Sequence, residues 1–155
     1  MFEYEHKVQY YETDQMQIVH HSNYIRWFEE ARMAMMESTG FGYEKMETQG
    51  VIIPVVEAQA SYRSMVRFGE TVLIRPKIKK FNGAVLEIIY DVVDKKTGVL
   101  RCQGRTKHAF LDAEGHLISL KYAKPEFYDY FRKLESAQTE PVTKGAQDPD
   151  KNPDS

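Results

Sequence analysis

The sequence has little cysteine, no long apolar run and no excess of either charge. Its one cysteine, Cys102, excludes an intrachain disulfide framework and any zinc site built from several thiolates. The first ten residues lack the continuous apolar segment of a signal peptide, and no later stretch reaches the length of a membrane-spanning helix. These absences predict a cytoplasmic protein that does not act at a membrane.

The charges are balanced over the chain and within its main part. Lys and Arg total 21 against 23 for Asp and Glu, and residues 1–135 hold equal numbers of each sign. A nucleic-acid partner is therefore not expected, because no basic field would attract it. A hydrophobic fraction of 42% over 155 residues favours a single globular domain, which we place at residues 1–135. Residues 136–155 hold three prolines and almost no large apolar residue, which predicts a flexible tail.

Hydrophobic periodicity predicts a strand followed by a long helix. Between Phe2 and Tyr10, apolar residues alternate with polar ones, as in a strand with one buried face. From Ser22 the spacing changes to that of a helix with one apolar face, formed by Tyr24, Trp27, Phe28, Ala31 and Met35. Ser22 or Asn23 is expected to cap this helix and Gly40 to end it.

The rest of the chain is predicted to be mostly strands. A short helix is expected over 43–48, strands through 51–56 and over 71–81, 85–94 and 99–111, and a final helix over 125–134. Turn signals at 82–83 and 96–98 favour antiparallel hairpins. The pattern predicts an α+β protein whose antiparallel sheet covers the aromatic face of the long helix. The unpaired edges of such a sheet favour a homo-oligomer.

The segment from Tyr11 to Tyr24 resembles the active-site segment of hotdog-fold acyl-CoA thioesterases of the 4-hydroxybenzoyl-CoA thioesterase-like family. The resemblance rests on Asp14 in a T-D pair, Ile18-Val19, His20-His21, Asn23-Tyr24 and Trp27-Phe28-Glu29. The order of elements extends it over roughly residues 2–134, including the motif from Tyr62 to Glu70. The chain departs from the family in two places, with Gln15-Met16-Gln17 where a glycine-containing turn is common and Ser64-Met65 where proline is usual.

The resemblance implies a hotdog fold, with an antiparallel sheet wrapped around a long central helix, and hydrolysis of an acyl-CoA thioester. It implies that Asp14 is the catalytic carboxylate, either as nucleophile or as general base for water, and both roles remain open. It also implies that the backbone N–H of His21 polarises the thioester carbonyl, because unsatisfied amides at a helix start stabilise developing negative charge. No cofactor is implied. The active site is expected between subunits of a homodimer or homotetramer.

Further residues are candidates for binding the substrate, each with an ordinary structural alternative. The candidates are Tyr24, Trp27, Glu57, Arg63, Arg67, Lys79 and Lys80. The cations would hold the phosphates of coenzyme A, although charged strand ends are usually solvated. The aromatic residues would border the acyl group, although helix-to-sheet packing is the commoner role. A metal bound by Asp14, His20 and His21 is not expected, because adjacent histidines diverge in an extended chain.

Two other functions remain open at this point. The same chemistry could release acyl groups from acyl carrier protein, which bears them on pantetheine. A non-catalytic acyl-binding protein could also keep this fold. The strand pattern does not determine the depth of the pocket, so short aliphatic, long aliphatic and aromatic acyl groups all remain possible.

Overall fold

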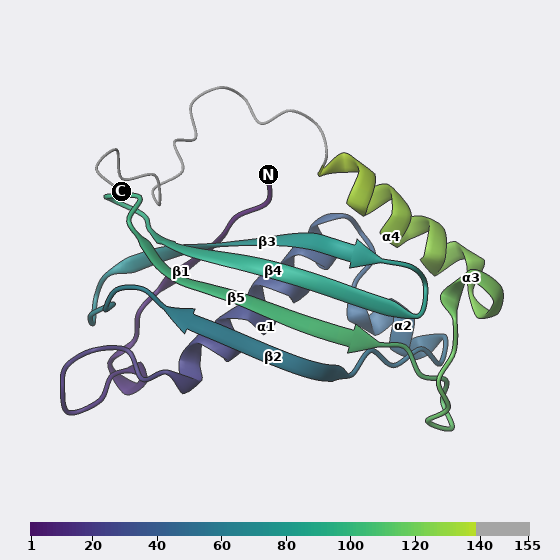
Figure 1. The fold of residues 1–155 in the computed structure, drawn as a ribbon, viewed down its shortest axis with the longest axis horizontal. Coiled ribbons are helices and arrows are strands. Elements are labelled where there is room, and N and C mark those ends of the chain that lie inside the picture. Colours follow the sequence, from purple (N-terminus) through teal and green to yellow (C-terminus); the bar gives the residue numbers. More distant parts are fainter. Residues whose placement is uncertain (139–155) are drawn as a thin grey trace.

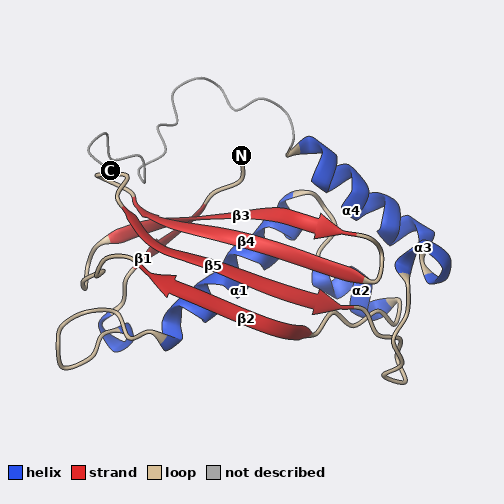
Figure 2. Ribbon diagram, in the orientation of Figure 1, coloured by secondary structure: helices blue, strands red, loops and turns tan. Residues whose placement is uncertain are grey.

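The computed structural model describes residues 1–138 as one antiparallel sheet with helices packed against it (Figure 1). In chain order the elements are β1 (Tyr4–Lys7), the 3-10 helix η1 (Tyr10–Glu12), α1 (Ser22–Ser38), α2 (Tyr43–Thr48), β2 (Val55–Tyr62), β3 (Thr71–Phe81), β4 (Val85–Asp94), β5 (Leu100–Ala109), α3 (Leu120–Ala123) and α4 (Pro125–Ala137). The strands lie in the order β1-β3-β4-β5-β2, with every neighbouring pair antiparallel. The predicted α+β class and antiparallel sheet are confirmed (Figure 2).

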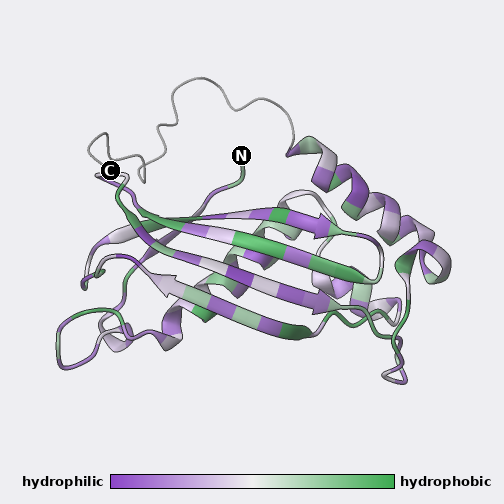
Figure 3. Ribbon diagram, viewed as in Figure 1, coloured by the Kyte–Doolittle hydropathy of each residue, from purple (hydrophilic) through white to green (hydrophobic). Residues whose placement is uncertain are grey.

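The core lies between α1 and one face of the sheet. The apolar side of the 17-residue α1 is buried, as the periodicity predicts, through Tyr24, Trp27, Phe28, Ala31, Met35 and Met36. In the middle strands alternate residues are buried, including Ile74, Ile88 and Val92. Figure 3 shows apolar residues to be dense along β4, in the middle of the sheet. Burial of this surface is the main force that holds the helix on the sheet.

One close approach fixes where α1 crosses the sheet. The ring of Phe28 stacks on that of Tyr90 in β4, with centroids 4.5 Å apart. It also lies over Gly104 in β5, where an added Cβ would come within 2.2 Å of two ring carbons. Position 104 must therefore remain glycine as long as Phe28 keeps this place, because no side-chain atom fits beneath the ring.

A polar cluster is buried farther along α1. Arg32 is only 4% exposed and donates hydrogen bonds to the hydroxyl groups of Tyr43 and Tyr90. Tyr90 and His108 each share a hydrogen bond with the hydroxyl of Thr106. Among residues 1–138, no Asp or Glu forms an ion pair with Arg32, and its hydrogen-bond acceptors are the two phenol oxygens. We call Arg32, Tyr43, Tyr90, Thr106 and His108 the arginine cluster.

Several element boundaries differ from those expected. The strand predicted through 51–56 begins only at Val55 and continues to Tyr62, so that an alternating polar segment lies on the edge strand β2. The first strand covers Tyr4–Lys7, because the chain turns into η1 at Tyr10. The last strand is Leu100–Ala109, slightly shorter than the predicted 99–111. Short strand ends fray where ladder hydrogen bonds give way to single bridges.

The predicted cap at the start of α1 is wrong, whereas the predicted end of the helix is confirmed. Ser22 and Asn23 lie inside the helix, so neither is its cap, and the N-cap position is taken by His21 without a capping side chain. Gly40 adopts a φ of 78° directly after Thr39 and ends the helix as expected.

Helix α4 covers the end of the sheet opposite the Asp14 loop (Figure 1). Its residues Phe127 and Phe131 are buried, and Phe131 contacts Phe81 of β3 with ring centroids 5.1 Å apart. The helix runs to Ala137 instead of ending at Leu134, and the remainder of the predicted tail, 139–155, lies outside the described residues. Over the described part of the chain, no helix has both the length and the apolar character needed to cross a bilayer.

Candidate active site

The loop between η1 and α1 folds back on itself and presents Asp14. The Asp14 N–H donates to the carbonyl of Ile18, and the Gln17 N–H donates to the carbonyl of Asp14. One carboxylate oxygen, Oδ1, accepts a hydrogen bond of 2.8 Å from the Met16 N–H. Gln17 has a φ of 63°, the left-handed conformation that glycine adopts most easily. The departure from the glycine-containing family turn is thus accommodated by a strained glutamine.

The start of α1 leaves one amide without a partner. The N–H groups of Val19 and His20 donate to the carbonyls of Val66 and Glu12. Those of Ser22, Asn23 and Tyr24 turn back onto His20 or His21. Among residues 1–138, the His21 N–H has no hydrogen-bond acceptor. A free amide at the positive end of a helix is suited to receive a developing oxyanion.

Asp14 and His21 open onto the same cavity. Its volume is about 500 Å³, and its walls are formed by Asp14, Met16, Ile18, Val19, His21, Tyr24, Tyr62, Arg63, Ser64 and Met65. A second cavity of about 370 Å³ is lined by Tyr10, Thr13, Asp14, Gln17, Arg67 and Phe68. Asp14 is common to both linings. Asp14 therefore borders both cavities.

Tyr62, at the end of β2, holds the peptide next to the free amide. Its hydroxyl donates a hydrogen bond of 3.2 Å to the carbonyl oxygen of His21. Its ring meets those of Tyr24 and His21 edge-on, with centroids 5.1 Å and 6.4 Å away. Tyr62 is not among the site residues predicted from the sequence, although it is the first residue of the motif from Tyr62 to Glu70.

A buried carboxylate lies behind the loop. Glu12 is 4% exposed, and its carboxylate accepts hydrogen bonds from the Gln9 N–H, His6 Nε2 and Trp27 Nε1. Burial by itself would raise the pKa of Glu12, but these three donors together lower it below its usual value. We call Glu12, His6, Trp27 and Asn23 the glutamate cluster. Sequence reasoning missed it, because Glu12 reads as an ordinary turn residue.

The structure brings some of the predicted site residues together and leaves others apart. Asp14, His21, Tyr24 and Arg63 all line the larger cavity. Arg67 lines the smaller one.

Four predicted substrate-binding residues lie outside the linings of both cavities. Trp27 is 1% exposed and is held within the glutamate cluster. Glu57 is exposed on β2 and pairs with Arg105. Lys79 and Lys80 are exposed near the end of β3, which lies at the opposite end of the sheet from Asp14 (Figure 1). A role for these four residues in binding stays a prediction.

Cys102 is not suited to act as a nucleophile. Its side chain is fully buried, and burial raises the pKa of the thiol to about 12, so that the thiol stays protonated near neutral pH.

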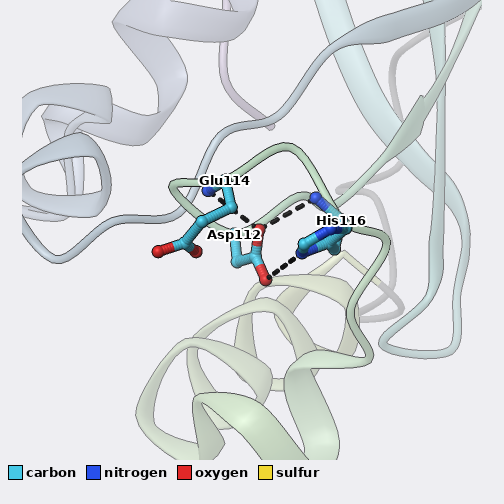
Figure 4. A group of neighbouring side chains, drawn as sticks. All are labelled: Asp112, Glu114 and His116. Carbon is cyan, nitrogen blue, oxygen red and sulfur yellow. Dashed lines mark hydrogen bonds and ion pairs between the residues drawn. The ribbon is translucent and has the colours of Figure 1, made fainter.

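A cluster of possible metal ligands is found in the loop after β5. The ligand atoms of Asp112, Glu114 and His116 lie within 4.8 Å of one another (Figure 4). The Asp112 carboxylate already accepts hydrogen bonds from the backbone N–H groups of Glu114 and His116, and backbone hydrogen bonds lower its pKa. The cluster is thus explained as a side-chain-capped turn.

Comparison with known proteins places the chain in one family. The model of the thioesterase-like superfamily matches residues 8–144. YneP of Bacillus subtilis, provisionally named an acyl-CoA thioesterase, is 35% identical over 128 residues, which cover 82% of this chain and 92% of YneP. A provisionally named esterase of Aquifex aeolicus is 32% identical over 119 residues, covering 77% of this chain and 91% of its own.

A solved structure agrees with these sequence relatives. The DHNA-CoA thioesterase of Staphylococcus aureus superposes with a TM-score of 0.82 at 28% identity, over 89% of this chain and 93% of its own. The hotdog fold predicted from the sequence is confirmed, and so is the predicted class of enzyme, a thioester hydrolase that acts on acyl-CoA. The chain belongs to the thioesterase-like superfamily.

Proposed function

We propose that the chain hydrolyses acyl-CoA with Asp14 as the catalytic carboxylate and the His21 N–H as the oxyanion donor. The observation that carries this proposal is the shared cavity, whose lining includes both Asp14 and His21, the residue that holds the only unpaired amide of the Val19–Tyr24 segment. Both groups are held in place before substrate arrives, which is what electrostatic stabilisation of a transition state requires.

The chemistry follows from these two groups. The His21 N–H binds the carbonyl oxygen of the thioester and stabilises its charge as the carbonyl carbon becomes tetrahedral. Asp14 either attacks that carbon, giving a mixed anhydride that water then cleaves, or takes a proton from the attacking water. Both routes consume one water, break the carbon–sulfur bond, and release a carboxylic acid and the free thiol of coenzyme A.

The two cavities that Asp14 borders suit the acyl and coenzyme A parts of a thioester. The larger cavity has mostly apolar walls, including Ile18, Val19 and Met65, and we assign it to the acyl group. The smaller cavity contains Arg67, and Arg63 lies at the larger one, so both cations are within reach of a bound coenzyme A. The Staphylococcus relative acts on DHNA-CoA, which makes an aromatic acyl group the first to test.

The edge strand β2 supports assembly into a homo-oligomer, either a homodimer or a homotetramer. Val55 and Val56 on this strand are 48% and 52% exposed. Tyr62, which lines the larger cavity, is also about half exposed. An exposed apolar edge next to the site is stabilised when a second copy pairs with it. The site would then lie between subunits. We place the assembled enzyme in the cytoplasm.

The test is release of free thiol from a panel of short, long and aromatic acyl-CoA substrates. Asp14→Asn should lower kcat by about 10³-fold or more while the fold is preserved, because it removes the nucleophile or base. Asp112→Asn is the matched control, since this aspartate caps a similar turn away from both cavities. Full activity of Asp14→Asn would refute the assignment. Turnover of acyl carrier protein substrates alone, or ligand binding without turnover, would favour the two alternative functions.

A further inference from the structure

The glutamate cluster holds the Asp14 loop at both of its ends. The Glu12 carboxylate is joined to α1 by a 2.6 Å hydrogen bond from Trp27 Nε1, and to the preceding chain by bonds of 2.7 and 2.8 Å from His6 Nε2 and the Gln9 N–H. Its own carbonyl oxygen accepts from the His20 N–H at 2.8 Å, just before the free amide. One residue thus joins the two ends of the loop.

Asn23 strengthens the same junction from inside α1. Its side-chain amide donates to the carbonyl oxygens of Glu12 and His20, at 2.9 and 3.3 Å. The Glu12 carbonyl consequently accepts hydrogen bonds from both the His20 N–H and the Asn23 side chain. His20 is therefore held at its N–H by Glu12 and at its carbonyl by Asn23. Asp14 lies two residues after Glu12, and His21 follows His20 directly. Any movement of Glu12 is therefore passed on to the carboxylate and to the amide together.

The cluster does not reach either cavity. Neither Glu12, His6, Trp27 nor Asn23 is part of a lining, and Glu12 and Trp27 are 4% and 1% exposed. The Glu12 carboxylate is buried and already accepts three hydrogen bonds, so it does not contact substrate. Its function has to be exerted through other groups.

We propose that Glu12 is the positioning residue of the catalytic loop, setting the distance between the Asp14 carboxylate and the His21 N–H through its bonds to Trp27, His6 and His20. This inference rests on the proposed catalytic role of Asp14. Trp27, predicted from the sequence to bind substrate, acts here as an anchor for Glu12. A small misplacement of reacting groups lowers the rate of the chemical step more than it weakens ground-state binding.

The central test is Glu12→Gln in the full chain, assayed by thiol release with the acyl-CoA that the parent turns over best. Glutamine keeps the size of the side chain but replaces one acceptor oxygen with an NH₂ group, which faces an N–H donor and cannot accept its hydrogen bond. We expect kcat to fall by about 100-fold and KM to stay within about twofold. Trp27→Phe, which removes only the indole donor, should lower kcat by about tenfold.

Two further measurements separate positioning from a general loss of structure. In the Asp14→Asn background, Glu12→Gln should cause a much smaller loss than in the parent, because one of the two groups that it positions is already gone. Trp27 is the only tryptophan of the chain, so the fluorescence of Glu12→Gln should change while its circular dichroism and unfolding midpoint show a folded protein. Glu5→Gln is the matched control on the same strand as His6, since Glu5 is exposed and pairs with Lys95.

The outcomes are distinct. Parental kcat in Glu12→Gln, with Asp14→Asn inactive, would overturn the positioning role and leave the proposed function intact. An equal additional loss in the Asp14→Asn background would also overturn it, since the effect would then not pass through Asp14. Full turnover by Asp14→Asn would refute the proposed function itself.

Discussion

The glutamate cluster and the arginine cluster both bury a charge against α1, yet they solve the problem differently. Glu12 is an anion whose carboxylate is met by three N–H donors. Arg32 is a cation met by two phenol oxygens, with no ion-pair partner in residues 1–138. The first cluster joins a loop to the start of the helix, whereas the second joins the middle of the helix to the sheet.

This difference shows what a buried charge can contribute. Burying an ion costs free energy unless hydrogen bonds satisfy it, so both clusters must be well ordered to exist. Order in the glutamate cluster is passed to Asp14 and His21, which line a cavity. The arginine cluster instead orders the packing of α1 against α2, β4 and β5. We therefore expect changes in the first to affect turnover and changes in the second to affect stability.

The largest effect should come from truncating the arginine cluster. Arg32→Ala removes a long buried side chain and leaves a hole beside Tyr90, which should lower the free energy of unfolding by about 2–4 kcal/mol. The variant, assayed below its unfolding midpoint, should keep a kcat close to that of the parent. Urea denaturation and thiol release check both statements. A large drop in kcat without loss of stability would break the division between the clusters.

Acidification should begin to destabilise the arginine cluster at a higher pH than the glutamate cluster. Burial and the nearby charge of Arg32 lower the pKa of His108 to about 3. A hydrogen bond to the backbone of Pro54 acts in the opposite direction, because it favours the protonated ring. The unfolded chain then takes up this proton first, so stability is lost as pH falls from 6.5 towards 3. The pKa of Glu12 is lowered from 4.5, so its contribution is present above pH 4.5 and is lost below it.

Two variants test this order. His108→Gln should flatten the dependence of the unfolding free energy on pH between 6.5 and 4.5, by about 2 kcal/mol. Glu12→Gln should flatten it only below 4.5. Urea unfolding at a series of pH values measures both, with Glu5→Gln as the control. The same flattening range in both variants would contradict the separation.

The smallest effect concerns the loop that the glutamate cluster holds. Gln17→Gly should relieve the left-handed backbone and raise the unfolding free energy by up to about 1 kcal/mol. Gly115→Ala, in the Asp112 turn, should do the opposite, because Gly115 has a φ of 85°. Thermal unfolding compares the two. A destabilised Gln17→Gly would show that the glutamine side chain matters more than its backbone strain.

The sequence predicts the parts of this molecule that depend on local pattern. The apolar face of α1, the turn at 82–83 and the strands over 71–81 and 85–94 all follow from periodicity or turn residues, and the structure confirms them. The start of β2 could not be placed, because the apolar run at 51–53 lies before the strand and is paired only through an isolated bridge between Ile52 and Leu111, beyond the end of β5.

The site was predicted where a motif exists and missed where only tertiary contacts exist. Asp14 and His21 were found from the resemblance, and both line the larger cavity. Glu12 could not be recognised, because its burial depends on η1 turning it towards Trp27, 15 positions away. The free amide of His21 is likewise decided by which carbonyls its neighbours reach, which no local pattern specifies.

The contact of Phe28 with Gly104 carries a consequence for how this sequence can change over evolutionary time. The two positions form one lock: a larger residue at 104 is tolerated only after the ring at 28 has been lost, and losing that ring also removes the stack on Tyr90. A first substitution at 104 is therefore blocked, whereas a first substitution at 28 sacrifices the stack but leaves room for the glycine. Lineages with a larger residue at 104 should therefore lack an aromatic ring at 28.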